Sequence, residues 1–509
     1  MSRFRIRVAV LCTVLASLGA AQVSLAGTGG QPGNRPNIVF ILADDFSMNL
    51  VDYMKKAPTL GLKRMMDEGA TFTNYFTSNS LCCPSRSTIF TGKYPHNTGV
   101  FTNTWNPAKG LVDGAFEAFQ AYHNEQHTFA IALHNGGYKT AMMGKYLNDY
   151  LPWKPSPTPY QTWGWDEWDV AGDGYPEFSY DLNHNGQVVH YGINPEDYLT
   201  DVVSKAAQDF ITANKTGPFF IEVATFAPHS PYRPAYRDET AYPSASLSKN
   251  PQPPYGVPAG PTAPDWIRDI PALTQPEKDA MDDAFRLRAQ SVRAIDKMIG
   301  EIRALLRKLK IDKNTYVFFS ADNGYHMGEY NFLPGKMTPF DVDINVPLVV
   351  VGPGIQPKMV TEIAQNVDLC PTFTELGASP AGTNPDGRSL VPLLQGTVPS
   401  WRKMALVEHH GPPDDPTDPD NEPHQRSSGK ANPPNYEALR TDQYLYVEYY
   451  NAGPNVTEQS YYDLATDKNE LNNTYKTLPP ARKKELHEAI VKNVDCGKPT
   501  KPACWQVQQ

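Results

Sequence analysis

Continuous apolar segments recur along the chain and predict strands that are buried on both faces. They are residues 37–43, 138–143, 218–225, 315–320 and 346–351. Between them, apolar residues recur at helical spacing, most clearly over 197–215 and over 275–310, which is long enough for one helix or a helix pair. Strands that alternate with helices predict an α/β fold, in which helices flank a large, mixed, mostly parallel sheet.

The pattern changes after Trp401. Short, often alternating segments predict strands at 405–409, 436–440, 443–450 and 460–464, and a final helix follows at 480–493. We therefore expect a large domain over 35–397 and a smaller α+β domain over 398–509, built on an antiparallel sheet. The aromatic and Gly-rich segment 153–192 is interpreted as long surface loops, and the Pro-rich segment 412–434 as another loop.

The first 26 residues have the features of a secretory signal. Arg3, Arg5 and Arg7 precede an apolar run over 8–21, and Ser24-Leu25-Ala26 supplies small residues before a cleavage point. A membrane anchor is the alternative, but the run is short for a bilayer. We expect an exported chain, periplasmic, secreted or lumenal, without a stable membrane anchor.

The net charge of the chain narrows the classes of partner that it can bind. The net charge of −9 argues against nucleic-acid binding by general electrostatics, so an anionic substrate would need positive charge concentrated in a site.

Of six cysteines, Cys496 and Cys504 close a short loop and are expected to pair in an exported protein. Cys82, Cys83 and Cys370 remain.

Polar residues follow four of the predicted strands. They are Asp44-Asp45, Lys145, His229 (between two prolines) and Asp322-Asn323. Carboxyl ends of parallel strands share one edge of a sheet, so these side chains can converge. Carboxylate and amide oxygens suit Ca²⁺ or Mg²⁺, whereas Lys and His suit an anion. Taken singly, each residue could instead be a solvated turn, a helix cap or a structural histidine.

The segment Cys82-Cys83-Pro84-Ser85-Arg86 continues to Thr91-Gly92-Lys93. Pro84 suits the first turn of a helix and Gly92 suits its end, which places Cys82 at a helix N-terminus. The free amides and dipole there favour an anion. A buried pair of structural cysteines is the alternative.

This segment resembles the signature of type I sulfatases of the alkaline phosphatase superfamily, in which the first Cys is oxidised to formylglycine. The likeness extends over about 36–473 and is greatest to N-acetylglucosamine-6-sulfatases. It rests on four stretches: 82–97, 144–148, 227–231 and 322–326. It implies an alkaline phosphatase-like fold and maturation by a formylglycine-generating enzyme.

The resemblance also implies roles for individual residues. One Ca²⁺ would be bound by Asp44, Asp45, Asp322, Asn323 and an oxygen of the modified Cys82. Arg86 would hold the hydrated aldehyde, and the sulfate would contact Lys145, His229 and Lys336. Asn148 and His326 are candidates for substrate contact. One departure is Leu147, where many arylsulfatases have a His.

The sequence therefore predicts a sulfuric ester hydrolase that cleaves a sulfated sugar, with 6-O-sulfated N-acetylglucosamine as the candidate. Alternative enzymes are an arylsulfatase of broad specificity and a phosphonate monoester or phosphodiester hydrolase of the same superfamily. Non-enzymatic alternatives are an exported carbohydrate-binding protein with a degenerate site and a cation-binding structural protein. A cation-binding role leaves Arg86, Lys145 and Lys336 unexplained.

Overall fold

A computed structural model describes most of the chain. It covers residues 35–105, 112, 114–154, 160, 162–249, 254–379, 384–397, 400–411, 433–450 and 455–509. The expected signal at 1–26 and nearly all of the loop expected at 412–434 lie outside the described residues.

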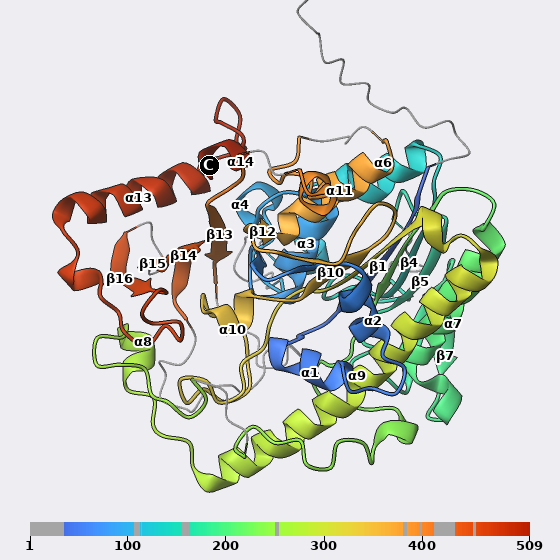
Figure 1. Cartoon of the computed structure of the whole chain (residues 1–509), viewed down its shortest axis with the longest axis horizontal. Helices are drawn as coiled ribbons and strands as arrows, with labels where there is room; N and C mark the ends of the chain where they lie inside the picture. The colour runs from blue at the N-terminus through green and yellow to red at the C-terminus, as the bar shows by residue number, and fades with distance from the viewer. Residues whose placement is uncertain are drawn as a thin grey trace, which may run out of the picture.

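A ten-stranded sheet forms the centre of the molecule (Figure 1). Its order is β11 (Lys358–Val360), β2 (Ala70–Phe72), β10 (Leu348–Val351), β9 (Thr315–Ala321), β1 (Asn37–Ala43), β8 (Phe219–Ala224), β4 (Lys139–Lys145), β5 (Glu167–Ala171), β6 (Tyr180–His184) and β7 (Gln187–Tyr191). Strands β9, β1, β8, β4 and β5 run parallel, while β10, β6 and β7 pair antiparallel with their neighbours. The predicted mixed, mostly parallel sheet is confirmed.

The interpretation of 153–192 as loops was wrong, because strands β5, β6 and β7 lie there and extend the sheet. Charged residues conceal β5, whose sequence is Glu-Trp-Asp-Val-Ala although Trp168 is fully buried. The last strand, β7, is almost wholly exposed, so it lacks the apolar run of a central strand. Hydrophobic pattern alone is a weak signal for strands of this kind.

Helices cover both faces of the sheet. Phe373 of α11 (Leu369–Leu376) packs on Phe220 of β8, whereas the next strand residue back, Phe219, meets Phe210 of α7 (Leu199–Asn214). Successive strand residues point to opposite faces, so α11 and α7 lie on opposite sides. The other α-helices described before residue 397 are α1 (Val51–Met54), α2 (Gly61–Glu68), α3 (Cys82–Thr91), α4 (Pro95–Thr98), α5 (Ala115–Ala121), α6 (Phe129–Asn135), α8 (Asp265–Arg268), α9 (Gln275–Leu309), α10 (Asp341–Ile344) and α12 (Val391–Gln395).

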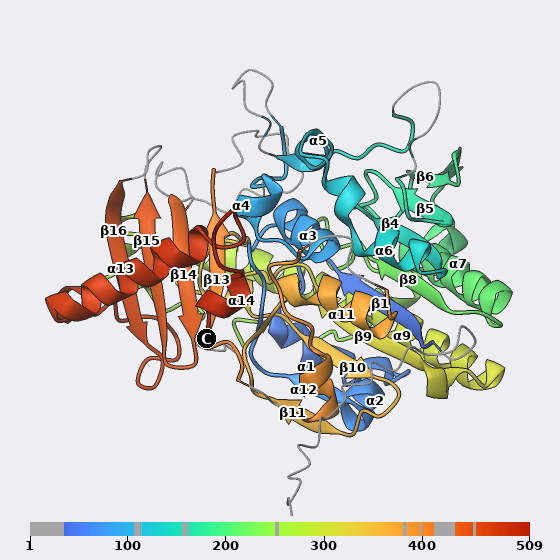
Figure 2. The same cartoon turned by 90° about the horizontal axis from the view of Figure 1, so that it is seen from above.

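A separate four-stranded antiparallel sheet lies beside the large one (Figure 2). It contains β13 (Met404–His409), β14 (Asn435–Thr441), β15 (Tyr444–Tyr450) and β16 (Val456–Asp463). Helix α13 (Pro480–Val494) buries Leu486 and Ile490 in one apolar cluster with Leu406, Leu439 and Tyr446 of the sheet. The expected disulfide between Cys496 and Cys504, at the start of α14 (Cys504–Val507), is present. The domain boundary at 397/398 stays a prediction.

Two further features complete the fold. Strands β3 (Tyr75–Phe76) and β12 (Ala364–Gln365) form a two-stranded parallel sheet. Strand β3 precedes the segment that leads to Cys82. Within the described ranges, no helix combines the length and apolar character needed to cross a membrane.

Candidate active site

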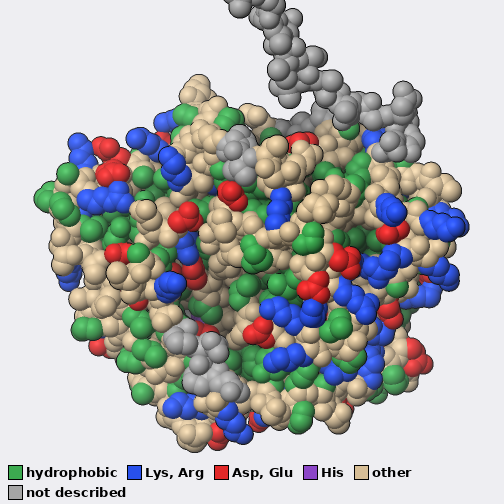
Figure 3. Space-filling model, in the orientation of Figure 1, with side chains coloured by type: hydrophobic (Ala, Val, Ile, Leu, Met, Phe, Trp, Pro, Cys, Tyr) green, Lys and Arg blue, Asp and Glu red, His purple; other side chains and the backbone are tan. Residues whose placement is uncertain are grey.

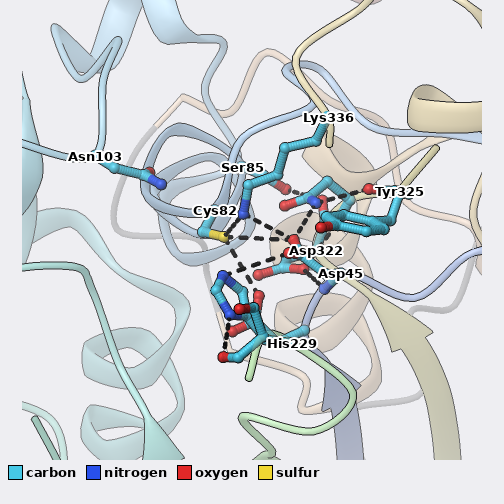
Figure 4. Close-up of polar contacts among 12 residues, drawn as sticks. Asp45, Cys82, Ser85, Asn103, His229, Asp322, Tyr325 and Lys336 are labelled. Carbon is cyan, nitrogen blue, oxygen red and sulfur yellow. Dashed lines mark hydrogen bonds and ion pairs between the residues drawn. The ribbon is translucent and has the colours of Figure 1, made fainter. Parts of the chain in front are cut away.

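The structure brings the predicted strand-end residues together at one edge of the parallel sheet (Figure 4). Asp44 and Asp45 follow β1, and Asp322 and Asn323 follow β9. Lys145 ends β4, and His229 lies in the turn after β8. These six side chains are almost completely buried.

Close packing of two strands delivers Lys145. The preceding residue, Gly144, has φ +92°, and a Cβ there would lie 1.8 Å from the Ala224 carbonyl oxygen of β8. Only Gly tolerates both the left-handed conformation and this approach.

Cys82 begins α3, as predicted, and Gly92 ends it in the left-handed conformation with φ 69°. The Cys82 Sγ lies 3.3 Å from Asp44 Oδ1 and 3.0 Å from Lys336 Nζ. The adjacent Cys83 amide donates to Asn103 Oδ1 at 2.8 Å. In a formylglycine residue, the Sγ position would be taken by the oxygens of the hydrated aldehyde.

Three buried cations alternate with three buried carboxylates. Arg86 Nε lies 2.8 Å from Asp322 Oδ2, Lys145 Nζ lies 2.6 Å from Asp44 Oδ2, and Lys336 Nζ lies 2.8 Å from Asp45 Oδ1. On the face of the molecule seen in Figure 3, basic and acidic side chains are interspersed. The three buried cations are thus matched by three carboxylates, and the low polarity of the interior strengthens each of these pairs.

The charges shift one another's pKa values in opposite directions. Burial favours the neutral form of Asp44, but Lys145 and then His229 outweigh it and hold the Asp44 pKa below its usual range. Burial and the nearby Asp44 charge instead raise the pKa of Asp322. Burial would lower the pKa of Arg86, yet Asp322 and Asp44 raise it further. Arg86 is thus a permanent cation of the site.

The oxygen atoms fit a hard divalent cation. Asp45 Oδ2 and Asn323 Oδ1 are buried and accept no hydrogen bond from any described residue. Buried acceptors without a donor are costly and call for a ligand. Together with Asp44 and Asp322 they offer the carboxylate and amide oxygens that Ca²⁺ prefers. Asp45 also has φ 53°, a conformation that is often kept where function requires it.

His229 presents one ring edge to this cluster. Its Nδ1 lies 2.8 Å from the Ser230 carbonyl oxygen, which requires Nδ1 to carry a proton and donate. Its Nε2 lies 3.4 Å from Asp45 Oδ2. The Tyr175 ring lies 4.6 Å from the imidazole between ring centroids. Nε2 is therefore the ring nitrogen directed at the reacting groups.

The structure places the two candidate substrate-binding residues next to the central cluster. Asn148 donates from Nδ2 to the Tyr175 hydroxyl at 3.1 Å. His326 Nδ1 lies 2.9 Å from Asp343 Oδ2. Its backbone also exchanges hydrogen bonds with Gly335, the residue before Lys336. These contacts indicate that His326 positions the loop that carries Lys336.

Arg288 of α9 is a further site residue, and it was not predicted from the sequence. Its guanidinium donates to the Asp45 carbonyl at 2.5 Å and to the Pro228 carbonyl at 3.2 Å, and lies 4.3 Å from the Tyr325 ring centroid. It therefore links the loops after β1, β8 and β9. A signal existed, because Arg288 interrupts the apolar helix face between Phe285 and Val292.

A family model described as Sulfatase matches residues 36–378. The chain belongs to the sulfatase family. It is therefore a sulfuric ester hydrolase, as the sequence predicted. A second model, described as N-sulphoglucosamine sulphohydrolase, C-terminal, matches residues 328–495 of this sulfatase.

Curated relatives confirm the predicted likeness within the family. The N-acetylglucosamine-6-sulfatase of Homo sapiens is 31% identical over 92% of this sulfatase and 86% of the relative. The protein of the same name from Capra hircus is 31% identical over 95% of this chain and 87% of its own.

Solved structures confirm the fold of this sulfatase. One is a complex with its substrate D-glucosamine-2-N,6-O-disulfate, and it has a TM-score of 0.68 at 22% identity, covering 90% of this chain and 97% of the other. The phosphonate monoester hydrolase of Agrobacterium radiobacter has a TM-score of 0.62 at 19% identity, covering 90% and 95%. Fold likeness alone therefore does not separate sulfate from phosphonate esters.

Proposed function

We propose that this sulfatase removes sulfate from a sugar, with formylglycine at position 82 and one bound Ca²⁺. The observation that carries the proposal is the place of Cys82. Its Sγ lies at a helix N-terminus, between the Asp44 carboxylate at 3.3 Å and the Lys336 ammonium at 3.0 Å. The reacting atom would thus lie between the carboxylate oxygens that can bind a metal and the Lys336 ammonium, which can bind an anion.

Each proposed cofactor would supply one kind of chemistry. Hydrated formylglycine supplies two hydroxyl groups on one carbon, one for attack on sulfur and one for the later release of sulfate. Ca²⁺ would be held by the Asp44, Asp45, Asp322 and Asn323 oxygens and an oxygen at position 82, and it would supply positive charge to the site.

The residues of the chain perform the remaining steps. Lys145 and Lys336 bind sulfate oxygens with fixed positive charge, and Arg86 holds the hydroxyl groups at position 82. Bond cleavage leaves negative charge on the sugar oxygen, which needs a proton. His229 can donate it from Nε2, because Nδ1 is already engaged by the Ser230 carbonyl.

A 6-O-sulfated N-acetylglucosamine is the proposed substrate. Its support is the name of relatives that are 31% identical over nearly the whole chain. Leu147, where many arylsulfatases have a His, is consistent with that subgroup. We further propose that the chain is exported and that a formylglycine-generating enzyme modifies it during maturation.

Mass spectrometry of the peptide that contains Cys82 tests the proposal. In active protein it should be lighter than the thiol form, because oxygen replaces sulfur and hydrogen is lost. Cys82→Ala and Cys82→Ser should lose nearly all turnover of 6-sulfated N-acetylglucosamine. Alanine has no nucleophile, and a single serine hydroxyl has no second hydroxyl group that could expel the sulfate. Cys370→Ala, which changes a buried thiol in α11, is the matched control and should stay active. An unmodified thiol in fully active protein would refute the mechanism.

A phosphonate monoester hydrolase is the second candidate, favoured by the fold likeness to that enzyme. Initial rates on a 6-sulfated sugar, an aryl sulfate and an aryl phosphonate should be compared. We expect kcat/KM to be highest on the sulfated sugar. A preference for the phosphonate would instead assign the second function.

A further inference from the structure

Three glutamates form a row across the C-terminal sheet. The register places Glu408 of β13 opposite Glu437 of β14, and Glu437 opposite Glu448 of β15. Directly opposed residues of antiparallel strands share a face, where like charges destabilise the pairing. Glu448 is well compensated, because two tyrosine hydroxyls and His487 contact its carboxylate. The pair Glu408 and Glu437 needs its own compensation.

His410 completes a ligand set at this end of the row. One ligand atom from each of Glu408, Glu437 and His410 lies within 4.8 Å of the others. His410 Nε2 is 2.8 Å from Glu437 Oε1. Glu437 is only 6% exposed, and its other oxygen, Oε2, accepts no hydrogen bond from the described residues. A buried carboxylate oxygen of this kind indicates an unfilled ligand position.

His96 of α4 orients Glu408 from outside the set. Its Nδ1 lies 2.8 and 2.9 Å from the two carboxylate oxygens, and its Nε2 lies 3.1 Å from the Cys496 carbonyl oxygen. Ligating carboxylates are usually held by such outer contacts. Side-chain exposure of His410 is 35%, so an ion could enter from solvent.

We propose that Glu408, Glu437 and His410 bind a second divalent metal, for which Zn²⁺ fits best. One imidazole nitrogen and carboxylate oxygens, with a position left for water, are ligands that Zn²⁺ accepts. Ca²⁺ prefers oxygen ligands alone, so the site is chemically distinct from the Asp44 cluster.

The metal would brace the segment that leads to Cys82. The Glu408 amide donates to the Ser78 carbonyl at 2.9 Å, and Asn79 Nδ2 donates to the Glu408 carbonyl at 2.6 Å. Clamping the Glu408 side chain would therefore hold β13 against residues 78–79. The expected role is structural and does not alter the sulfatase chemistry.

Zn²⁺ titration of the full chain, kept in saturating Ca²⁺, tests the site. Calorimetry and metal counting by mass spectrometry should find one Zn²⁺ per chain in addition to Ca²⁺. Co²⁺ in its place should give visible absorption from nitrogen and oxygen ligands. His410→Ala and the isosteric Glu437→Gln should each weaken Zn²⁺ binding at least ~10-fold.

A second histidine and carboxylate cluster in the described chain provides the control. His184 lies with Glu167 and Asp169 at the far edge of the large sheet. His184→Ala should leave Zn²⁺ binding unchanged. Melting curves recorded in chelator would verify that each variant folds. The proposal is overturned if no Zn²⁺ binds, if Glu437→Gln binds it normally, or if His184→Ala abolishes binding.

Discussion

At the scale of single residues, Glu222 is a buried carboxyl group next to the active site, and its burial is energetically unfavourable. It lies in β8, is fully buried, and neither carboxylate oxygen has a hydrogen-bond partner among the described residues. Burial raises its pKa to about 8, although the Arg86 charge acts in the opposite direction. The charges that bear on it are Arg86 and, if ionised, the neighbouring Tyr146 phenol. We therefore expect a protonated Glu222 at neutral pH.

This assignment predicts a pH-dependent stability. The folded protein keeps the Glu222 proton up to about pH 8, whereas the unfolded chain loses it near the usual 4.5. Between these values the folded state binds more protons, so raising the pH costs roughly 1.4 kcal/mol of stability per unit. Glu222→Gln should reduce the measured slope by this amount. Denaturant unfolding of both proteins from pH 5 to pH 8 measures it.

An equal pH slope in wild type and Glu222→Gln would show that this carboxyl does not carry the proton. Cys370→Ala, another buried change on the same side of the sheet, should keep the wild-type slope.

At the scale of elements, the central strands were predictable and their surroundings less so. The segment 37–43 is a continuous apolar run because β1 is buried on both faces. The polar residues at the ends of β1 and β9 were also visible, since chemistry gathers at that edge of a parallel sheet. Strands β5 to β7 were hidden by charged and exposed residues. The backbone pairing of His326 with Gly335, next to Lys336, depends on the path of a loop, which no local sequence pattern predicts.

Helix α9 supplies the positioning residue of the site, and this gives a prediction. Arg288→Met leaves the carbonyls of Asp45 and Pro228 without their donor, so the loops after β1 and β8 should shift. Outer contacts of this kind are typically worth ~10- to 100-fold in metal affinity or activity. We expect such a loss in Ca²⁺ affinity, measured by Ca²⁺-dependent melting, with a lower kcat and a smaller change in KM.

Arg288→Lys should recover part of the loss, because its ammonium can satisfy one carbonyl. Arg293→Met is the matched control on the same helix, where the side chain pairs with Asp238 at 2.7 Å, away from the strand ends. If Arg288→Met kept the wild-type Ca²⁺ affinity, Arg288 would not be needed to position the metal-binding loops.

At the scale of the whole molecule, the C-terminal unit contacts helix α4, which follows the signature segment. The Cys496 carbonyl oxygen lies 3.1 Å from His96 Nε2 and accepts from Asn97 Nδ2 at 3.1 Å. The disulfide to Cys504 therefore closes a loop that also contacts residues next to the signature. The disulfide was predictable because the two cysteines lie close together in the sequence. The contacts of the Cys496 carbonyl with His96 and Asn97 were not predictable from the sequence.

Removing the disulfide should weaken the molecule without abolishing its chemistry. The double variant Cys496→Ser with Cys504→Ser should lose about 2 kcal/mol of unfolding free energy, mainly because the unfolded chain becomes less constrained. Thermal unfolding measures the loss. Activity well below the transition should remain near normal, since neither cysteine touches the cluster around Cys82. Unchanged stability after mutation would show that side-chain packing, not the covalent link, secures the C-terminus.

The complete enclosure of Cys82 constrains how the protein can be made. Its side chain has no exposure in the folded chain, and α3 is buried along its whole length. An enzyme that oxidises it must therefore meet the segment while it is still extended, before the sheet closes around it. Folding and maturation would then compete in time, and a chain that folds first would be well formed but permanently inactive. Slower synthesis or delayed folding should thus raise the active fraction of the protein recovered, without changing its stability.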